Sequence, residues 1–260
     1  MVNKYDLAFT IPCFNEAERI DLKYWEEIFK LDDKIFWLFV NDGSTDRTIE
    51  LLKQLSFSNC CEILNLPKNV GKSEALRQGF IYLTNNEMKF DGIGFIDADG
   101  AFEKADILNL IELFRNSKNS LGIFWDSIIA SRIALAGRNI NRKPLRHYIG
   151  RIFATVATIH WRKSPYDTQC GLKIFRNNLG FQMSILDKFK TRWFIDLELF
   201  SRMSLNNQSE ISILEIPLNS WSDIAGSKLG VRQKIISVME LFLVSKMLKK
   251  NIYLNLTEKI

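Results

Sequence analysis

The stretch Ile35–Ser44 reads Ile-Phe-Trp-Leu-Phe-Val-Asn-Asp-Gly-Ser, and it decides the class of fold. Its six consecutive apolar residues leave no polar face, which is typical of a strand buried on both sides in a parallel sheet. The cluster Asn41–Ser44 consists of turn-forming residues. An apolar strand that ends in such a turn, ahead of the helical segment Thr45–Leu55, predicts one strand–helix unit of an α/β fold.

The same order of strand, polar turn and helix recurs along the first half of the chain. Further strands are expected at Leu7–Ile11, Ile63–Leu66, Ile93–Ile96 and Ser127–Ala130. Further helices are expected where apolar residues are spaced three and four apart, at Glu16–Lys30, Lys72–Leu83 and Ala105–Phe114. This alternation predicts a mostly parallel, Rossmann-like sheet with helices on both faces.

The second half is less regular, and we expect it to complete the same compact unit. We predict strands at Gly171–Phe175 and Ile211–Ile216, and helices at Leu145–Trp161, Asp196–Leu205 and Val231–Lys250. The chain is therefore divided into a main domain, residues 1–230, and a C-terminal helical elaboration with its tail, residues 231–260.

The composition excludes several classes of protein. With 47% hydrophobic and 25% charged residues in 260, the chain is not disordered. Its 4 cysteines show no C-x-x-C spacing, which favours reduced thiols in the cytosol. The net charge of +5 suits anionic small molecules or an anionic membrane surface. Because no dense Lys/Arg stripe is present, we expect no nucleic-acid partner.

No segment is predicted to span a membrane. The N-terminal residues lack the apolar core and cleavage site of a signal peptide. The longest apolar stretch, Ile235–Leu248, is interrupted by Glu240 and Lys246 and is shorter than the roughly 20 residues that a spanning helix needs. We therefore expect a cytoplasmic protein, either soluble or peripheral to a membrane.

Polar clusters follow the first four expected strands, and ligands of open parallel sheets bind at this edge. The clusters are Pro12–Glu16, Asn41–Asp46, Asn69–Lys72 and Asp97–Asp99. Turn formation explains each of them alone. It explains less readily why the last one carries two carboxylates directly after an apolar strand.

Asp97 and Asp99 flank Ala98 in a D-x-D sequence. Alternate residues of an extended chain point to the same side, so both carboxylates can hold one Mg²⁺ or Mn²⁺ that bridges to substrate phosphates. The G-x-G-x-x-G of dinucleotide-binding proteins is absent after the first strand. Gly71-Lys72-Ser73 lacks the first glycine of a P-loop, although Lys72 can still reach a phosphate from a helix N-terminus.

These motifs resemble the family 2 inverting glycosyltransferases with a GT-A fold. The resemblance covers roughly residues 5–230 and narrows in the second half to the dolichyl-phosphate β-glucosyltransferase branch, less closely to polyprenol-phosphate mannosyltransferases. Its motifs are Ile11–Glu16, Val40–Asp46, Gly71-Lys72, Asp97–Ala101, Ser131-Arg132, Asp167–Phe175, Arg192–Leu199 and Gly226–Leu229. The D-T-Q-C-G and R-W-x-x-D-x-E-L sequences are the specific ones.

The resemblance implies roles at the donor. The residues that would bind the nucleotide or its phosphates are Pro12, Phe14, Glu16, Asp42, Lys72, Asp97 and Ala98. Asp97 and Asp99 would hold the metal. Family members often carry Tyr where Phe14 stands, and many prenyl-phosphate enzymes carry Gln where Ala101 stands, so a hydroxyl contact and a metal ligand are missing here.

The resemblance also implies residues at the acceptor. Arg132 and Arg146 would grip the acceptor phosphate, and Lys228 would close over a phosphate from a mobile loop. The alternative for Arg146 and Lys228 is a role as ordinary surface residues. Asp196 stays ambiguous, because a phosphate acceptor is already ionised and needs no base. Asp196 would then hold donor hydroxyls or orient Arg192, act as the base for a sugar hydroxyl, or cap the helix that follows.

The expected function is thus metal-dependent transfer of a hexose, glucose from UDP-glucose, to a polyprenyl phosphate at the cytosolic face of a membrane. The first alternative is a sugar-hydroxyl acceptor with Asp196 as base, and the second is a sugar-nucleotide-binding protein without turnover. The apolar face and basic flanks of Val231–Lys250 suit a membrane surface, or packing on the domain or on another subunit.

Overall fold

The computed structural model describes residues 4–56, 58–141, 155, 158, 164–192, 194–207, 211–222 and 240. The strands are β1 (Leu7–Cys13), β2 (Ile35–Asp42), β3 (Cys61–Leu66), β4 (Gly92–Ile96), β5 (Ser127–Ser131), β6 (Asn139–Asn141), β7 (Leu172–Arg176), β8 (Ile213–Pro217) and β9 (Ser220–Ser222). The helices are α1 (Leu22–Phe29), α2 (Thr48–Leu55), α3 (Lys72–Thr84), α4 (Lys104–Asn116), α6 (Leu179–Ser184) and α7 (Ile195–Asn206).

Seven strands form one sheet in the order β3-β2-β1-β4-β7-β5-β8. Neighbouring strands from β3 to β4 are parallel, and so are β5 and β8. The exception is β7, which is antiparallel to β4 and to β5 on either side of it. The prediction of a mostly parallel sheet is confirmed, and the antiparallel β7 is a feature that the sequence did not indicate.

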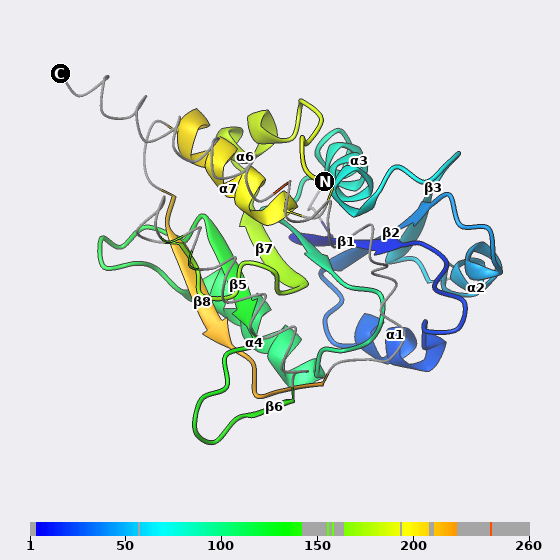
Figure 1. The fold of residues 1–260 in the computed structure, drawn as a ribbon, viewed down its shortest axis with the longest axis horizontal. Coiled ribbons are helices and arrows are strands. Elements are labelled where there is room, and N and C mark those ends of the chain that lie inside the picture. Colours follow the sequence, from blue (N-terminus) through cyan, green and yellow to red (C-terminus); the bar gives the residue numbers. More distant parts are fainter. Residues whose placement is uncertain are drawn as a thin grey trace.

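Helices cover both faces of the large sheet, as predicted, with α3, α6 and α7 on one face and α1, α2 and α4 on the other (Figure 1). Each face has its own apolar core. Side chains of β1 alternate between them: Phe9 and Ile11 lie in the core under α1, α2 and α4, whereas Ala8 lies in the core under α3 and α7. Such two-sided burial explains the unbroken apolar run of β2.

Two predicted helices begin later than expected because polar side chains end the loops before them. The helix expected from Glu16 begins at Leu22, where the Asp21 carboxylate accepts a hydrogen bond from Tyr24 N. The helix expected from Thr45 begins at Thr48, whose backbone N–H donates to Asp46 Oδ1 at 3.0 Å. The residues that were expected to be helical, before Leu22 and before Thr48, instead belong to the loops at the carboxyl edge of the sheet.

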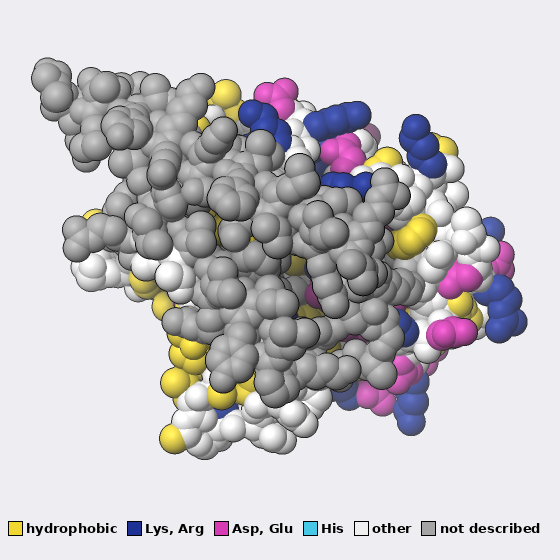
Figure 2. All heavy atoms as spheres, in the orientation of Figure 1, with side chains coloured by type: hydrophobic (Ala, Val, Ile, Leu, Met, Phe, Trp, Pro, Cys, Tyr) yellow, Lys and Arg dark blue, Asp and Glu magenta, His cyan; other side chains and the backbone are white. Residues whose placement is uncertain are grey.

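Two predicted helices, Leu145–Trp161 and Val231–Lys250, lie almost wholly outside the described residues; of them the structure describes only Thr155, Thr158 and Glu240. None of the helices in the described ranges combines the length and apolar character needed to cross a bilayer. All four cysteines are unpaired thiols, as expected. Figure 2 shows Lys and Arg side chains interspersed with Asp and Glu over the side of α1, α2 and β3, so the positive charge is not concentrated there.

We expect Gly79→Ala to destabilise the fold, although alanine is the better helix former by about 1 kcal/mol. Gly79 of α3 faces the sheet, and a Cβ there would lie 2.4 Å from Thr10 Cγ2 and 3.0 Å from Val40 Cγ2. Overpacking of this kind costs about 1–3 kcal/mol. Urea unfolding measures the change, and Gln78→Ala, one residue along the helix, should stay within about 0.5 kcal/mol of the unsubstituted protein. A stabilised Gly79→Ala variant would contradict the tight packing of α3 on β1.

Candidate active site

The loops after the parallel strands meet at one edge of the sheet. Asn15, in the loop after β1, accepts from the backbone N–H of Thr45 at 2.8 Å, and its own N–H donates to Ser44 Oγ at 3.0 Å. Asn15 has a φ of 51°, a left-handed conformation that asparagine tolerates better than most residues. The loops after β1 and β2 therefore form one hydrogen-bonded surface.

Asp42 ties the loop after β3 to the end of β2. Its carboxylate accepts from Val70 N at 2.7 Å, from Gly71 N at 2.9 Å and from Asn69 Nδ2 at 2.9 Å. Burial raises the pKa of Asp42, although these hydrogen bonds stabilise its ionised form. Both oxygens are thus engaged in shaping the loop that leads into Lys72, and a contact of Asp42 with a base or ribose stays a prediction.

Each carboxylate of the D-x-D sequence is paired with a cation from a different loop. Lys72, at the start of α3, places its Nζ 2.5 Å from Asp97 Oδ1. Arg19, in the loop before α1, places its Nη2 2.8 Å from Asp99 Oδ2, and its Nη1 lies 3.1 Å from Glu16 Oε2. Four predicted site residues, Glu16, Lys72, Asp97 and Asp99, therefore belong to one network of charges.

The pKa values in this network reflect burial and close like charges. Burial and the neighbouring Asp97 raise the pKa of Asp99, against the opposing effect of Arg19. For Lys72, burial disfavours the ammonium, but the carboxylates of Asp97, Asp196 and Asp99 outweigh it and raise the pKa. The lysine is therefore fully charged at neutral pH.

Ala98, between the two carboxylates, points away from them. It is buried, and its carbonyl oxygen accepts from the indole of Trp25 in α1 at 3.2 Å. The backbone here is thus anchored to the core, while Asp97 and Asp99 on either side reach the surface. Pro12 lies in β1 and Phe14 directly after it, half-buried at the same edge.

Gly171, in the D-T-Q-C-G sequence, lies directly against the carboxylate of Asp97. A Cβ at this position would lie 2.0 Å from Asp97 Oδ2, and the Gly171 carbonyl accepts from Asp97 N at 2.9 Å. Only a residue without a side chain allows this approach. The motif that sequence reasoning marked as specific therefore forms the floor under the first aspartate.

Beneath this floor lies an ion pair that is fully enclosed. Lys173 of β7 is 0% exposed, and its Nζ lies 2.5 Å from Asp196 Oδ1 of α7. The same ammonium donates to the carbonyl oxygens of Thr168 at 3.0 Å and Cys170 at 2.5 Å. Burial raises the pKa of Asp196, while Lys173 and the more distant Lys72 oppose the rise.

Asp196 does not cap its helix. The helix α7 begins at Ile195, one residue earlier than predicted, and the N-cap position is Phe194. The Asp196 carboxylate instead faces Lys173, and Gln169 Nε2 lies 3.5 Å from its other oxygen. The capping interpretation is therefore wrong, because the side chain turns into the protein interior.

Arg132, which follows β5, forms a bidentate ion pair with Asp167. Its Nε and Nη2 lie 2.7 Å and 2.8 Å from the two carboxylate oxygens. Asp167 raises the pKa of Arg132 against the effect of burial. The guanidinium carbon also lies 5.1 Å from the ring centre of Trp221. Trp221 lines a hollow of about 600 Å³ that extends to Gly100 and Ala101, directly beyond the D-x-D sequence.

Two predicted site residues, Arg146 and Lys228, lie outside the described residues. Conversely, sequence reasoning missed Arg19 and Lys173. Arg19 stands three residues after Glu16, a spacing that brings side chains together within one helical turn. Lys173 interrupts the apolar sequence Leu172–Phe175 of a buried strand, and a charge in such a place needs a partner.

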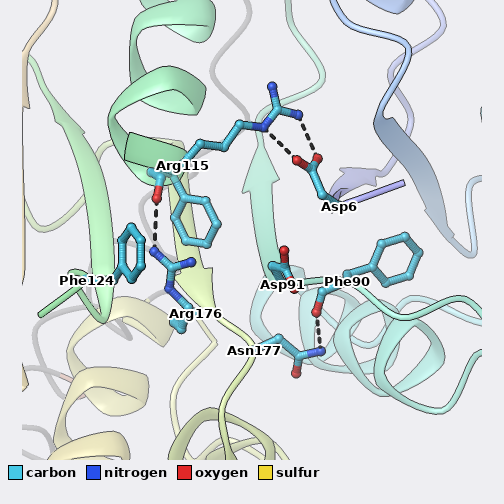
Figure 3. A pocket seen from close by; sticks show the side chains of 8 residues that line it. Asp6, Phe90, Asp91, Arg115, Phe124, Arg176 and Asn177 are labelled. Carbon is cyan, nitrogen blue, oxygen red and sulfur yellow. Dashed lines mark hydrogen bonds and ion pairs between the residues drawn. The ribbon is translucent and has the colours of Figure 1, made fainter. Parts of the chain in front are cut away.

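A second hollow, of about 440 Å³, lies at the other end of the parallel strands, near the residues that precede β1 and β4 (Figure 3). Its two arginines already make contacts within the protein: Arg115 bonds both oxygens of Asp6 and also pairs with Asp32. Arg176 donates to the Phe114 carbonyl at 2.9 Å and stacks on the ring of Phe114. These contacts hold α4 against the sheet. The loops at the carboxyl edge of the sheet therefore remain the candidate site.

The residues present suit a divalent metal held jointly with a ligand. Asp97 and Asp99 offer the hard oxygen atoms that Mg²⁺ and Mn²⁺ prefer, and their side chains are 34% and 20% exposed. Within the described ranges, no cluster of three or more His, Cys, Asp or Glu side chains could hold a metal without outside ligands. Water molecules and phosphate oxygens of a substrate would complete the coordination.

A mostly parallel sheet with polar loops and a D-x-D sequence at its carboxyl edge defines the GT-A class of glycosyltransferases. Residues 9–172 match the family model described as "Glycosyl transferase family 2", and the chain belongs to this family. It is a hexosyltransferase by this membership and by its relatives.

Two curated relatives are dolichyl-phosphate beta-glucosyltransferases. That of Saccharomyces cerevisiae is 31% identical over 242 residues, which are 86% of this chain and 69% of the relative. One of Trichomonas vaginalis is 30% identical over 245 residues, covering 90% of this chain and 69% of the relative. Glucosyl-3-phosphoglycerate synthase from Mycobacterium tuberculosis, crystallised with uridine diphosphate, has a TM-score of 0.63 at 13% identity and covers 93% of this chain and 80% of its own, a likeness of fold alone.

We expect Lys173→Met to destabilise the protein by about 3–5 kcal/mol, because it leaves the carboxylate of Asp196 buried without its partner. Urea unfolding at pH 7 measures the loss. In the double variant Lys173→Met/Asp196→Asn no unpaired charge remains, so most of the stability should return. Equal stability of the single and double variants would show that the two side chains are not coupled.

Proposed function

We propose that the protein transfers glucose from UDP-glucose to a polyprenyl phosphate, assisted by Mg²⁺ or Mn²⁺, with inversion at the anomeric carbon. The observation that carries the proposal is the charge network at the carboxyl edge, where Asp97 and Asp99 face Lys72 and Arg19 from other loops. Support for the acceptor and for glucose comes from the curated relatives, whose names state dolichyl phosphate and glucose.

The donor diphosphate would lie against Asp97, Asp99 and Lys72. Bound there, the metal supplies positive charge that stabilises the departing nucleoside diphosphate. Lys72 adds a second positive charge from the N-terminus of α3, where the helix dipole also favours a phosphate. Pro12, Phe14, Glu16 and Asp42 would border the nucleoside at the ends of β1 and β2.

The buried position of Asp196 favours an acceptor that needs no base. Its side chain is 6% exposed and one of its oxygens faces the Lys173 ammonium, so an acceptor hydroxyl has little access to it. A phosphate monoester is already ionised near neutral pH and can attack the sugar directly. In this mechanism Asp196 helps to position the D-T-Q-C-G motif beneath Asp97 and takes no part in proton transfer.

Arg132 would border the acceptor phosphate from the other side of the D-x-D sequence. Its guanidinium is oriented by Asp167 and lies over the ring of Trp221, which lines a hollow together with Gly100 and Ala101. From the sequence, Arg146 and Lys228 would complete this binding site, and the Val231–Lys250 segment would contact the cytosolic face of the membrane that contains the acceptor.

The identity of donor and acceptor is tested by mass spectrometry of products. The protein is incubated with Mn²⁺, a mixture of nucleotide sugars, and a short polyprenyl phosphate or a free sugar acceptor. We expect a hexosyl polyprenyl phosphate formed from UDP-glucose. A glycosylated sugar would instead support the hydroxyl acceptor with Asp196 as base, and binding of the nucleotide sugar without any product would support a binding protein.

We expect Asp99→Asn to lower transfer by at least about a hundredfold while leaving the fold intact, because the substitution removes a charged ligand of the metal. Initial rates with and without EDTA measure the loss. The exposed Asp33→Asn removes the same charge elsewhere and should retain the rate of the unsubstituted protein. Full activity of the unsubstituted enzyme in excess EDTA would refute metal dependence.

A further inference from the structure

Arg19 pairs with one carboxylate oxygen of Asp99, a residue that we expect to hold the metal. Its Nη2 lies 2.8 Å from Asp99 Oδ2, and its side chain is only 21% exposed. Lys72 stands in the same relation to Asp97, at 2.5 Å. Each of the two carboxylates that would hold the metal is therefore paired with a cation of the protein itself.

A divalent cation that arrives alone meets two obstacles. It has to displace Arg19 and Lys72 from the two carboxylates, and the positive charges of Arg19 and Lys72 repel it. Two like unit charges about 4 Å apart repel appreciably at the effective dielectric constant near a protein surface. No third carboxylate, histidine or cysteine of the described residues joins Asp97 and Asp99 to compensate. The free protein should accordingly bind the metal weakly.

A nucleoside diphosphate removes both obstacles at once. Its phosphate oxygens provide a new partner for the guanidinium, which binds phosphate with two parallel hydrogen bonds as readily as it binds a carboxylate. Its negative charge also attracts the metal. Arg19 is placed for such a change of partner, because Glu16, at 3.1 Å, keeps the guanidinium at the end of β1 when Asp99 is released.

We propose that Arg19 is an exchangeable counter-ion: it pairs with Asp99 until the nucleotide binds, and it then moves to the donor diphosphate and leaves Asp99 to the metal. The inference rests on the proposed donor and metal, and it adds a diphosphate-binding residue to that site. It means that bound nucleotide favours entry of the metal. It also means that Arg19 opposes binding of the metal alone and favours binding of the nucleotide alone.

Two opposite effects of one substitution test the proposal. Arg19→Met keeps the aliphatic stem and removes the charge. Mn²⁺ alone should bind this variant about tenfold more tightly than the unsubstituted protein, measured by the electron paramagnetic resonance signal of free Mn²⁺. UDP in the presence of EDTA should bind it about tenfold more weakly, measured by calorimetry.

Matched variants separate this effect from a general change in charge or fold. Lys23→Met removes an exposed positive charge of α1, four residues along, and should leave both affinities unchanged. Arg19→Lys retains the charge without the two-pronged geometry, so it should bind Mn²⁺ as the unsubstituted protein does and UDP more weakly. Thermal unfolding confirms that each variant is folded.

An affinity for Mn²⁺ alone that is equal or lower in Arg19→Met, including no detectable binding to either protein, overturns the proposal. So does an unchanged affinity for UDP in EDTA where the unsubstituted protein binds it. Failure of the proposed function gives a different result, because UDP then does not bind the unsubstituted protein even with Mn²⁺. In that case the Mn²⁺ titrations still show whether Arg19 opposes binding of the metal at Asp99.

Discussion

The ammonium group of Lys173 is enclosed in the protein, and the candidate active site is built around the contacts that this charge requires. A buried ammonium is tolerated only when it is paired and hydrogen-bonded. Lys173 meets this requirement with the carboxylate of Asp196 and the carbonyls of Thr168 and Cys170. These partners fix the turn that carries Gly171, and Gly171 is the surface on which the Asp97 carboxylate rests. One internal charge thus links β7, α7 and the D-x-D sequence.

Charge compensation governs the surface of the site as well as its interior. Asp97, Asp99 and Glu16 are each close to a cation, and so is Asp167 to Arg132. Such a balanced network keeps the free protein stable although several like charges meet at one edge of the sheet. It also suits a substrate that carries both a metal and a diphosphate, which together are close to neutral. The metal could then contact the carboxylates of the network, and the diphosphate could contact its cations. In the mechanism that we propose, the site is therefore prepared for the metal and the diphosphate together rather than for either ion alone.

Most of the fold could be predicted from local patterns. The apolar runs of β1, β2 and β4 and the turn residues after them are sufficient to predict a parallel sheet, and the four loops at its carboxyl edge follow from that topology. Errors arose where a local signal was overruled by a distant or competing contact. Asp21 caps α1 and so delays its start, and Asp46 holds the loop before α2 by accepting a hydrogen bond from Thr48 N. The antiparallel direction of β7 depends on its insertion between β4 and β5. It could not be predicted from the residue types of Leu172–Arg176.

The sequence by itself determined the chemistry of the site: two carboxylates after an apolar strand, a lysine at a helix start, and motifs that place the chain among glycosyltransferases. These are properties of residue type and spacing, which a linear chain already contains. Only the tertiary structure decided the pairing of charges: Arg19 with Asp99 across 80 positions of sequence, and Lys173 with Asp196 in the interior. The physical reason is that an ion pair depends on distance in space and on exclusion of water, and both arise only when the sheet and its helices have packed.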